Sequence, residues 1–254
     1  MKQPYYRSEN VTLYCADWSD AAAQMEWNSV DCIVTDPPYE SLNKWREIGT
    51  TARLGGHRDP DKRDEAKWFQ TISNDDLPDL LQYCMLLLKP NTHCYVMCDF
   101  DTMPYMLQYG VVEGVFQHCA QLIWDKCAPG MGYHYRRQYE SIMMFDKGKN
   151  RRLNDLSVSD VLRFPMVNGK SKLYPTQKPV ELFQQLIRQS TAPGEVVFDP
   201  FLGSGTCAVA ALREGRRCVG IDIDKEACAI AEKRIREEEA KLQLPFDTLE
   251  EAFS

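Results

Sequence analysis

The apolar positions of the chain fall into short runs and longer periodic stretches that alternate along it. The short runs predict β-strands near residues 11–16, 31–36, 93–99, 115–124, 139–145, 195–201 and 217–222. The periodic stretches predict helices near 76–88, 179–191, 205–213 and 225–240. Strands that alternate with helices are typical of a mainly parallel sheet covered on both faces. We therefore expect an α/β, Rossmann-like fold with a seven-stranded sheet and ligands at the carboxyl ends of its strands.

Length and composition fit a single globular domain. The chain has 254 residues, of which 44% are hydrophobic and 26% are charged. No apolar run reaches the ~18 residues that a membrane span needs, and residues 1–10 are too polar for a signal-peptide core. We expect one domain over residues 1–254 of a soluble, cytoplasmic protein, with a polar loop insertion at about 40–72.

Ten cysteines and four histidines raise the question of a metal site. No two cysteines are spaced C-x-x-C, and most of them lie in apolar segments, where they are expected to be small core residues. The histidines are scattered, and only His93 lies close to two cysteines, Cys94 and Cys98. We therefore predict no metal.

The tetrapeptide Asp36-Pro37-Pro38-Tyr39 closes the strand expected at 31–36. Its two prolines end the hydrogen-bond ladder and fix the backbone, so carbonyl groups stay available at a rigid strand tip. A flat heterocycle could stack on Tyr39 while its exocyclic amine donates to Asp36 and to the Pro37 carbonyl. The alternative is a proline-bounded strand end with a surface tyrosine. We favour a catalytic site, because about one chain in several hundred would carry this match by chance.

A second candidate site begins where the strand expected at 195–201 runs into a glycine-rich turn, with Gly203 and Gly205, and then a helix. Glycines in such a turn let a ligand approach the backbone. The third glycine of the dinucleotide fingerprint is absent, so a dehydrogenase is the least favoured interpretation. About twenty residues later Asp222 ends another strand, where an acid suits a ribose diol. The two features predict a nucleoside cofactor without a pyrophosphate; a simple tight turn is the alternative.

These segments together resemble the amino-group DNA methyltransferases. Residues 36–39 are similar to that family's catalytic motif, and residues 199–206 are similar to its S-adenosylmethionine motif. The catalytic motif comes first, which is the permuted order of the subgroup often called the β class. Residues 174–179 and 13–17 resemble further family segments, although the family usually has His at position 174 and Gly at position 16. The resemblance covers roughly residues 11–39 and 93–236.

The resemblance implies an S-adenosylmethionine-dependent methyltransferase that acts site-specifically on double-stranded DNA. Asp at position 36 is associated mainly with the N6 amine of adenine. Cytosine N4 is the alternative, and protein or RNA is a less favoured substrate, because Asn more usually heads the motif in those enzymes. The target base would be flipped out of the duplex and stacked on Tyr39. A binding module without turnover is disfavoured by the intact Asp36 and Tyr39.

The resemblance leaves open a monomer or a homodimer and an accompanying restriction nuclease. The catalytic residues that it implies are Asp36, Pro37, Pro38 and Tyr39. The cofactor-binding residues that it implies are Asp17, Thr176, Lys178, Asp199, Pro200, Phe201, Gly203, Ser204, Gly205, Thr206 and Asp222.

The net charge of −7 does not suit DNA binding, but the charge is unevenly distributed. Residues 126–178 hold eleven Lys or Arg and four Asp or Glu, so this segment carries +7 and the remainder −14. Such a segment favours phosphate contacts, and a solvated loop is the alternative. Residues 146–173 within it occupy the place of the family's target-recognition region and are short for a separate domain. The predicted DNA-binding residues are Arg136, Arg137, Lys147, Lys149, Arg151, Arg152, Lys170 and Lys172.

Overall fold

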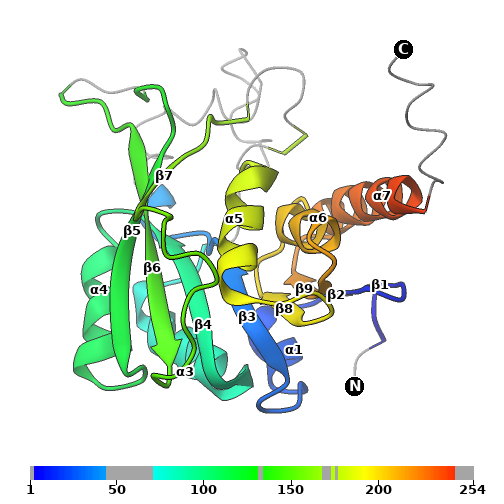
Figure 1. Ribbon diagram of the computed structural model, residues 1–254, viewed down its shortest axis with the longest axis horizontal. Helices are drawn as coiled ribbons and strands as arrows, with labels where there is room; N and C mark the ends of the chain where they lie inside the picture. Colours follow the sequence, from blue (N-terminus) through cyan, green and yellow to red (C-terminus); the bar gives the residue numbers. More distant parts are fainter. Residues whose placement is uncertain (1–2, 44–70, 131–133, 168–172, 175–176, 244–254) are drawn as a thin grey trace.

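The computed structural model describes residues 3–43, 71–130, 134–167, 173–174 and 177–243. These residues build one sheet with helices on both of its faces (Figure 1). Its strands are β1 (Tyr6–Arg7), β2 (Val11–Cys15), β3 (Val30–Thr35), β4 (Leu88–Cys98), β5 (His118–Asp125), β6 (Tyr139–Lys147), β7 (Val161–Arg163), β8 (Val196–Asp199) and β9 (Arg217–Asp222).

The sheet is mainly parallel, and its strand order is β1-β2-β9-β8-β3-β4-β6-β5-β7. Strands β2, β9, β8, β3 and β4 run parallel to one another, whereas β1 is antiparallel to β2, and β6 is antiparallel to both β4 and β5. Every residue of β3 is buried, as expected of a central strand covered on both faces. The parallel strands end at one edge of the sheet, here called the carboxyl edge, and begin at the opposite, amino edge.

The helices form two layers. They are α1 (Trp18–Ala22), α3 (Leu77–Leu87), α4 (Met103–Leu107), α5 (Val180–Ser190), α6 (Thr206–Arg213) and α7 (Lys225–Leu242). Helix α5 packs on α6 and α6 on α7 over one face, while α1 packs on α3 behind the sheet as seen in Figure 1. The longest helix, α7, begins at Asp224, whose carboxylate accepts the Glu226 N–H at 2.9 Å. This arrangement confirms the expected α/β, Rossmann-like fold.

The number of strands corrects the prediction of seven, because the described residues form a sheet of nine. All seven expected strands are present, and the two others are β1, of two residues, and β7, of three. Segments this short cannot display an apolar period, and the same reason hides the five-residue helices α1 and α4. Strand β5 starts at His118 rather than near 115, because a π-helical turn (Gln108–Val112) and its connection precede it.

The search for a membrane-spanning helix and for a metal-binding group covers only the described part of the chain. Within it, no helix is both long and apolar enough to cross a bilayer. The same residues hold no group of three His, Cys, Asp or Glu side chains placed to bind a metal ion. Most of the loop insertion expected at about 40–72 falls in residues 44–70, outside the described residues.

Candidate active site

Three carboxylates meet at the carboxyl edge because their strands are neighbours. Asp36 directly follows β3, Asp199 ends β8 and Asp222 ends β9, and these strands lie side by side in parallel register. The Thr35 hydroxyl donates to Asp199 Oδ1 at 2.7 Å and joins the two motifs across 164 positions of sequence. The expected catalytic and cofactor segments therefore form one site.

Both carboxylate oxygens of Asp36 have partners. The Tyr39 hydroxyl donates to Oδ1 at 2.6 Å, and the Lys178 ammonium donates to Oδ2. Burial, reinforced by the charge of Asp36, raises the pKa of Tyr39 well above its ordinary value, so the phenol stays a neutral donor. The ring expected to offer a stacking face is only 7% exposed, and its hydroxyl is tied to the catalytic carboxylate.

Lys178 belongs to a row of four charged groups of alternating sign, here called the ion chain: Lys126, Glu140, Lys178 and Asp36. Glu140 Oε1 lies 2.5 Å from Lys126 Nζ, and Glu140 Oε2 lies 3.6 Å from Lys178 Nζ. Burial alone would raise the pKa of Glu140, but the two ammonium groups outweigh it and lower that pKa. Burial alone would lower the pKa of Lys178, but Asp36 and Glu140 raise it. Glu140 and Lys178 are thus both charged at neutral pH.

The glycine turn leads from β8 into α6 with its backbone bent into the left-handed region. Gly203 has φ +53° and Gly205 has φ +84°. A Cβ on Gly205 would lie 3.0 Å from the Ala231 Cα, so α7 packs directly against the turn. The Gly203 N–H donates to Asp222 Oδ2 at 2.7 Å, which joins the turn to the end of β9.

Asp222 is suited to accept hydrogen bonds from a diol. Its carboxylate takes two backbone N–H groups, from Gly203 and, at 2.8 Å, from Asp224. Burial raises the pKa of Asp222, and these two hydrogen bonds oppose the rise. An ionised carboxylate offers about four lone-pair positions, so acceptor capacity remains for ribose hydroxyls.

Asp199 is more deeply buried than Asp222 and has internal partners. It is 3% exposed, and its Oδ1 accepts from Thr35 and from the Phe201 N–H at 3.0 Å. Burial raises the pKa of Asp199 to about 7, against the effect of these hydrogen bonds. The contacts show Asp199 fixing the turn between β8 and α6; contact with the cofactor stays a prediction.

Apolar surfaces flank the turn. The rings of Trp18 and Phe201 lie 6.1 Å apart between centroids, at an interplanar angle of 49°. The Tyr174 ring lies 3.9 Å from the position that a Cβ on Gly203 would take. Ile223, next to the acidic end of β9, is 48% exposed. A diol acceptor, a glycine turn and aromatic side chains at one edge fit a nucleoside with a polar tail.

The remaining residues of the predicted cofactor site make structural contacts around the glycine turn. Asp17 caps α1 by accepting the Ser19 N–H at 2.9 Å. Pro200, Ser204 and Thr206 are buried, and Thr206 Oγ1 donates to the Lys178 carbonyl at 3.5 Å. This contact connects the turn to the segment that carries Lys178. Thr176 lies outside the described residues.

The predicted DNA-binding residues are divided between the two edges of the sheet. Arg136 and Arg137 are exposed in the connection from β5 to β6 at the carboxyl edge, and the Arg137 guanidinium lies 5.6 Å from the Phe100 ring centroid. Lys147, the last residue of β6, donates at the amino edge to the Leu88 carbonyl at 2.6 Å. Lys170 and Lys172 lie outside the described residues.

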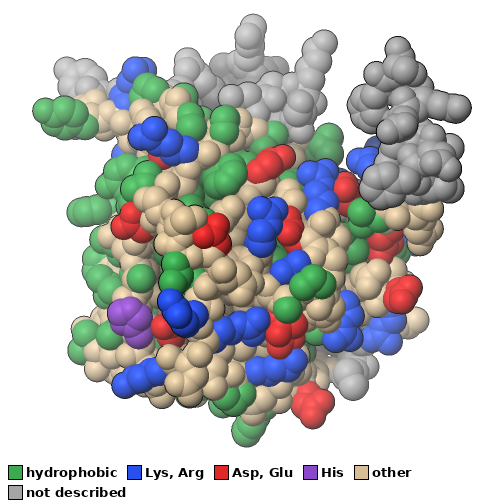
Figure 2. All heavy atoms as spheres, in the orientation of Figure 1, with side chains coloured by type: hydrophobic (Ala, Val, Ile, Leu, Met, Phe, Trp, Pro, Cys, Tyr) green, Lys and Arg blue, Asp and Glu red, His purple; other side chains and the backbone are tan. Residues whose placement is uncertain are grey.

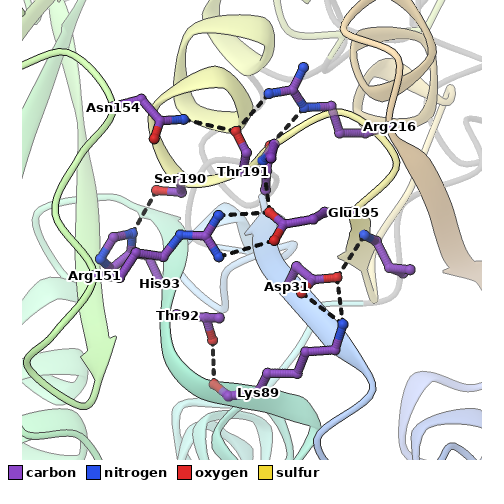
Figure 3. Close-up of polar contacts among 12 residues, drawn as sticks. Asp31, Lys89, Thr92, His93, Arg151, Asn154, Ser190, Thr191, Glu195 and Arg216 are labelled. Atoms are coloured by element: carbon purple, nitrogen blue, oxygen red, sulfur yellow. Dashed lines mark hydrogen bonds and ion pairs between the residues drawn. The ribbon is translucent and has the colours of Figure 1, made fainter.

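Arg151 shows how the amino-edge cations are used. It pairs with Glu195, at the start of β8, at 2.7 Å in a polar network that also holds Asn154 and Thr191 (Figure 3). Figure 2 shows that Lys and Arg are interspersed with Asp and Glu on the face of the molecule turned to the viewer, and do not form a basic stripe there. Lys149 and Arg152 flank Arg151 and are exposed. The prediction of one basic stripe is therefore corrected for the described residues: the structure places Lys147 to Arg152 at the amino edge, opposite the edge that holds Asp36.

Comparison with known proteins places this arrangement in a family. Residues 30–233 match the family model described as DNA methylase. The chain belongs to that family. It is 27% identical to the Type II methyltransferase M2.DpnII of Streptococcus pneumoniae over 94% of each protein. It is 28% identical to the DNA adenine methyltransferase YhdJ of Escherichia coli (strain K12), over 91% of this chain and 84% of that protein.

Solved structures of DNA methyltransferases share the fold. The complex of M1.HpyAVI with S-adenosylmethionine aligns with a TM-score of 0.60 at 22% identity, over 89% of this chain and 99% of that one. The cytosine-N4-specific PvuII DNA methyltransferase aligns with a TM-score of 0.68 at 18% identity, over 92% of this chain and 89% of that one. The predictions of an amino-group DNA methyltransferase and of S-adenosylmethionine as its cofactor are confirmed at the level of the family.

Three side chains of this methylase site were not among the predicted site residues: Lys126, Glu140 and Trp18. Glu140 carries a signal in retrospect, because it is a carboxylate at the start of an otherwise apolar strand, followed by Ser141 and a run of buried residues. Lys126 directly follows β5, two residues after Trp124, which pairs with Glu140, so the side chain of Lys126 lies on the same face of the hairpin as Glu140. Trp18 carries no comparable signal, since a tryptophan in a short helix is usually a packing residue.

Proposed function

We propose that this chain transfers the methyl group of S-adenosylmethionine to the N6 amino group of an adenine flipped out of double-stranded DNA, at a specific sequence. The observation that carries the proposal is the Asp36 carboxylate at the tip of β3, bonded to the buried Tyr39 hydroxyl and adjacent to the turn at Gly203 to Gly205. A relative named a DNA adenine methyltransferase, similar over 91% of this chain, supports adenine rather than cytosine.

The residues of the chain supply alignment and electrostatics for this reaction. Bound S-adenosylmethionine supplies an electrophilic methyl group, whose C–S bonding electrons pass to sulfur as the amine lone pair forms the new C–N bond. Asp36 would accept a hydrogen from the amine and stabilise the positive charge that develops on nitrogen, before one N–H proton is lost to solvent. Asp222 would hold the ribose diol.

DNA would approach the carboxyl edge, because a target base must reach Asp36 there. The exposed groups beside it are Phe100, Tyr135, Arg136 and Arg137, in the connections that follow β4 and precede β6. Guanidinium groups suit phosphates, and exposed aromatic rings suit unstacked bases. We place target recognition in the β5–β6 connection and in the part of 146–173 that follows β7, since residues 147–155 pack at the amino edge.

The chain would act as the methylase partner of a restriction nuclease of the same sequence specificity. Two relatives, from Streptococcus pneumoniae and Lactococcus lactis subsp. cremoris, are named Type II methyltransferases and are similar over 94% and 92% of this chain.

The decisive experiment reads modified bases in DNA from cells that express the chain. Wild type is compared with Asp36→Asn, which keeps the side-chain shape and removes the charge. We expect N6-methyladenine at one short sequence with wild type and none with the variant. N4-methylcytosine at one sequence would instead establish the cytosine alternative, and unmodified DNA would refute the proposal.

The DNA interface is tested by removing positive charge at one edge of the sheet at a time. Arg136→Ala with Arg137→Ala should weaken DNA binding at every sequence and reduce the slope of log affinity against log salt by about 1–2. Lys149→Ala with Arg152→Ala is the matched control, because it removes two exposed cations at the amino edge. Fluorescence anisotropy over a salt series measures both. A larger effect in the control pair would place DNA at the amino edge.

A further inference from the structure

In the structure, the Lys178 ammonium is bonded to the carboxylate that a target amine would use. It donates to Asp36 Oδ2, while the Tyr39 hydroxyl already occupies Oδ1 at 2.6 Å. The side chains of Lys178 and Asp36 are only 13% and 18% exposed, so water does little to separate them. An exocyclic amine would therefore meet a carboxylate that already accepts one hydrogen bond at each oxygen and is paired with an ammonium.

An ammonium bonded to that carboxylate also opposes the reaction electrostatically. Methyl transfer builds positive charge on the amine nitrogen, and Asp36 stabilises that charge best when it is not already neutralised by another cation. A buried ammonium cannot simply be left without a counterion, because an unpaired buried charge costs several kcal/mol in typical proteins. Lys178 needs a second acceptor before it can release Asp36.

Glu140 provides that acceptor. Its Oε2 is buried and has no hydrogen-bond partner among the described residues, and it lies 3.6 Å from Lys178 Nζ. Charge-assisted hydrogen bonds between nitrogen and oxygen are about 2.7–2.9 Å long, so a movement of roughly 1 Å completes one. The opposite oxygen, Oε1, is held by Lys126 at 2.5 Å, which fixes Glu140 in place while Lys178 moves.

We infer that Lys178 moves from Asp36 to Glu140 when the target base enters, so Glu140 is a positioning residue that frees Asp36 for the amine. The inference rests on the proposed function, because it needs an amine donating to Asp36. In the structure Lys178 pairs with Asp36, whose other oxygen accepts from Tyr39. In the substrate complex the amine replaces the ammonium, and the pair Lys178–Glu140 closes beside it.

Two variants of Glu140 separate charge from shape. Glu140→Gln keeps the length of the side chain and its hydrogen bonding but loses the charge that draws the ammonium away from Asp36. Glu140→Asp keeps the charge and shortens the reach by one methylene. A role in the reaction through Lys178 requires the Asp variant to be the faster one, whereas a packing role requires the Gln variant to be at least as fast.

The assay is single-turnover methylation of unmethylated bacterial genomic DNA with radiolabelled S-adenosylmethionine, both saturating. We expect Glu140→Gln to be slowed about tenfold or more, with Glu140→Asp between it and wild type, because a misplacement of about 1 Å at a reacting centre costs on this order. The dissociation constant for S-adenosylmethionine, measured by calorimetry, should stay within about twofold, since Glu140 pairs with lysines rather than with the glycine turn.

Glu195→Gln is the matched control, because it removes one carboxylate of an ion pair with Arg151 at the amino edge. It should methylate at the wild-type rate. A Glu140→Gln rate equal to or above that of Glu140→Asp, or a slowing below about fivefold relative to wild type, overturns the inference while leaving the proposed function standing. A wild-type chain that methylates no DNA overturns both.

Discussion

Burial of Asp199 without a cation predicts a stability that falls as pH rises. Its pKa is raised from 3.8 to about 7, so between these values the folded state holds a proton that the unfolded chain has released. Stability from this group is complete below pH 4 and declines as pH rises towards the folded pKa. Asp199→Asn keeps the acceptor for Thr35 and Phe201 but cannot ionise. The variant should therefore lose this pH dependence.

The size of the effect follows from the shift. At about 1.4 kcal/mol per pKa unit, a rise of roughly three units limits the contribution of Asp199 to the free energy of unfolding to about 4 kcal/mol. Because part of this contribution is already lost below pH 5, we expect a further loss of about 3 kcal/mol between pH 5 and pH 8. Urea unfolding at both pH values, without cofactor, gives the free energy of unfolding of each protein. Wild type should lose about 3 kcal/mol more than Asp199→Asn over this interval, since all other groups are shared. Parallel curves for the two proteins would refute the assigned protonation state.

Three further predictions concern the rest of the site. Tyr39→Phe keeps the ring but loses the 2.6 Å hydrogen bond to Asp36, so methylation should fall by about threefold to tenfold, and an inactive Phe variant would show the hydroxyl to be essential. Gly205→Ala should destabilise the fold by about 2–3 kcal/mol in thermal unfolding, which is more than Gly114→Ala should, because both glycines have positive φ but of the two only Gly205 packs against another helix. Equal losses of stability in the two variants would exclude the packing contribution. Asp222→Asn should weaken S-adenosylmethionine binding by about 1–3 kcal/mol in calorimetry, and an unchanged affinity would show that the ribose diol does not bind Asp222.

The fold and the centre of the site could be predicted because their signals are local. The sequence of β3 is typical of a buried strand, the two prolines after it fix where it ends, and the glycine turn marks the connection from β8 to α6. In a parallel sheet the ends of such strands must lie at one edge, so Asp36, Asp199 and Asp222 could be brought together without coordinates. The short elements β1 and β7 could not, because two or three residues carry no period.

The surface charges could not be placed from sequence, because strand direction decides which edge they reach. Strand β6 is antiparallel, so Tyr139 begins it at the catalytic edge and Lys147 ends it at the other. Its nine residues separate the two ends by roughly 27 Å, at about 3.4 Å per residue. A run of cations that is continuous in sequence is thereby split between Arg137, beside the site, and Arg151, in the amino-edge network.

The carboxylates of Asp199, which is buried, and Glu140, which is partly buried, show what the lysines of the ion chain contribute. Burial by itself would raise the pKa of both, and both have partners nearby. Among the described residues Asp199 accepts from neutral donors, a hydroxyl and a backbone N–H, and its pKa reaches about 7. Glu140 lies between Lys126 and Lys178, and its pKa is lowered. The two neutral hydrogen bonds of Asp199 therefore do not offset its burial, whereas the two ammonium groups beside Glu140 do. The ammonium of Lys178 lies against Asp36 and within reach of Glu140, so the ion chain joins the carboxylate at the tip of β3 to a second anionic partner for the same lysine.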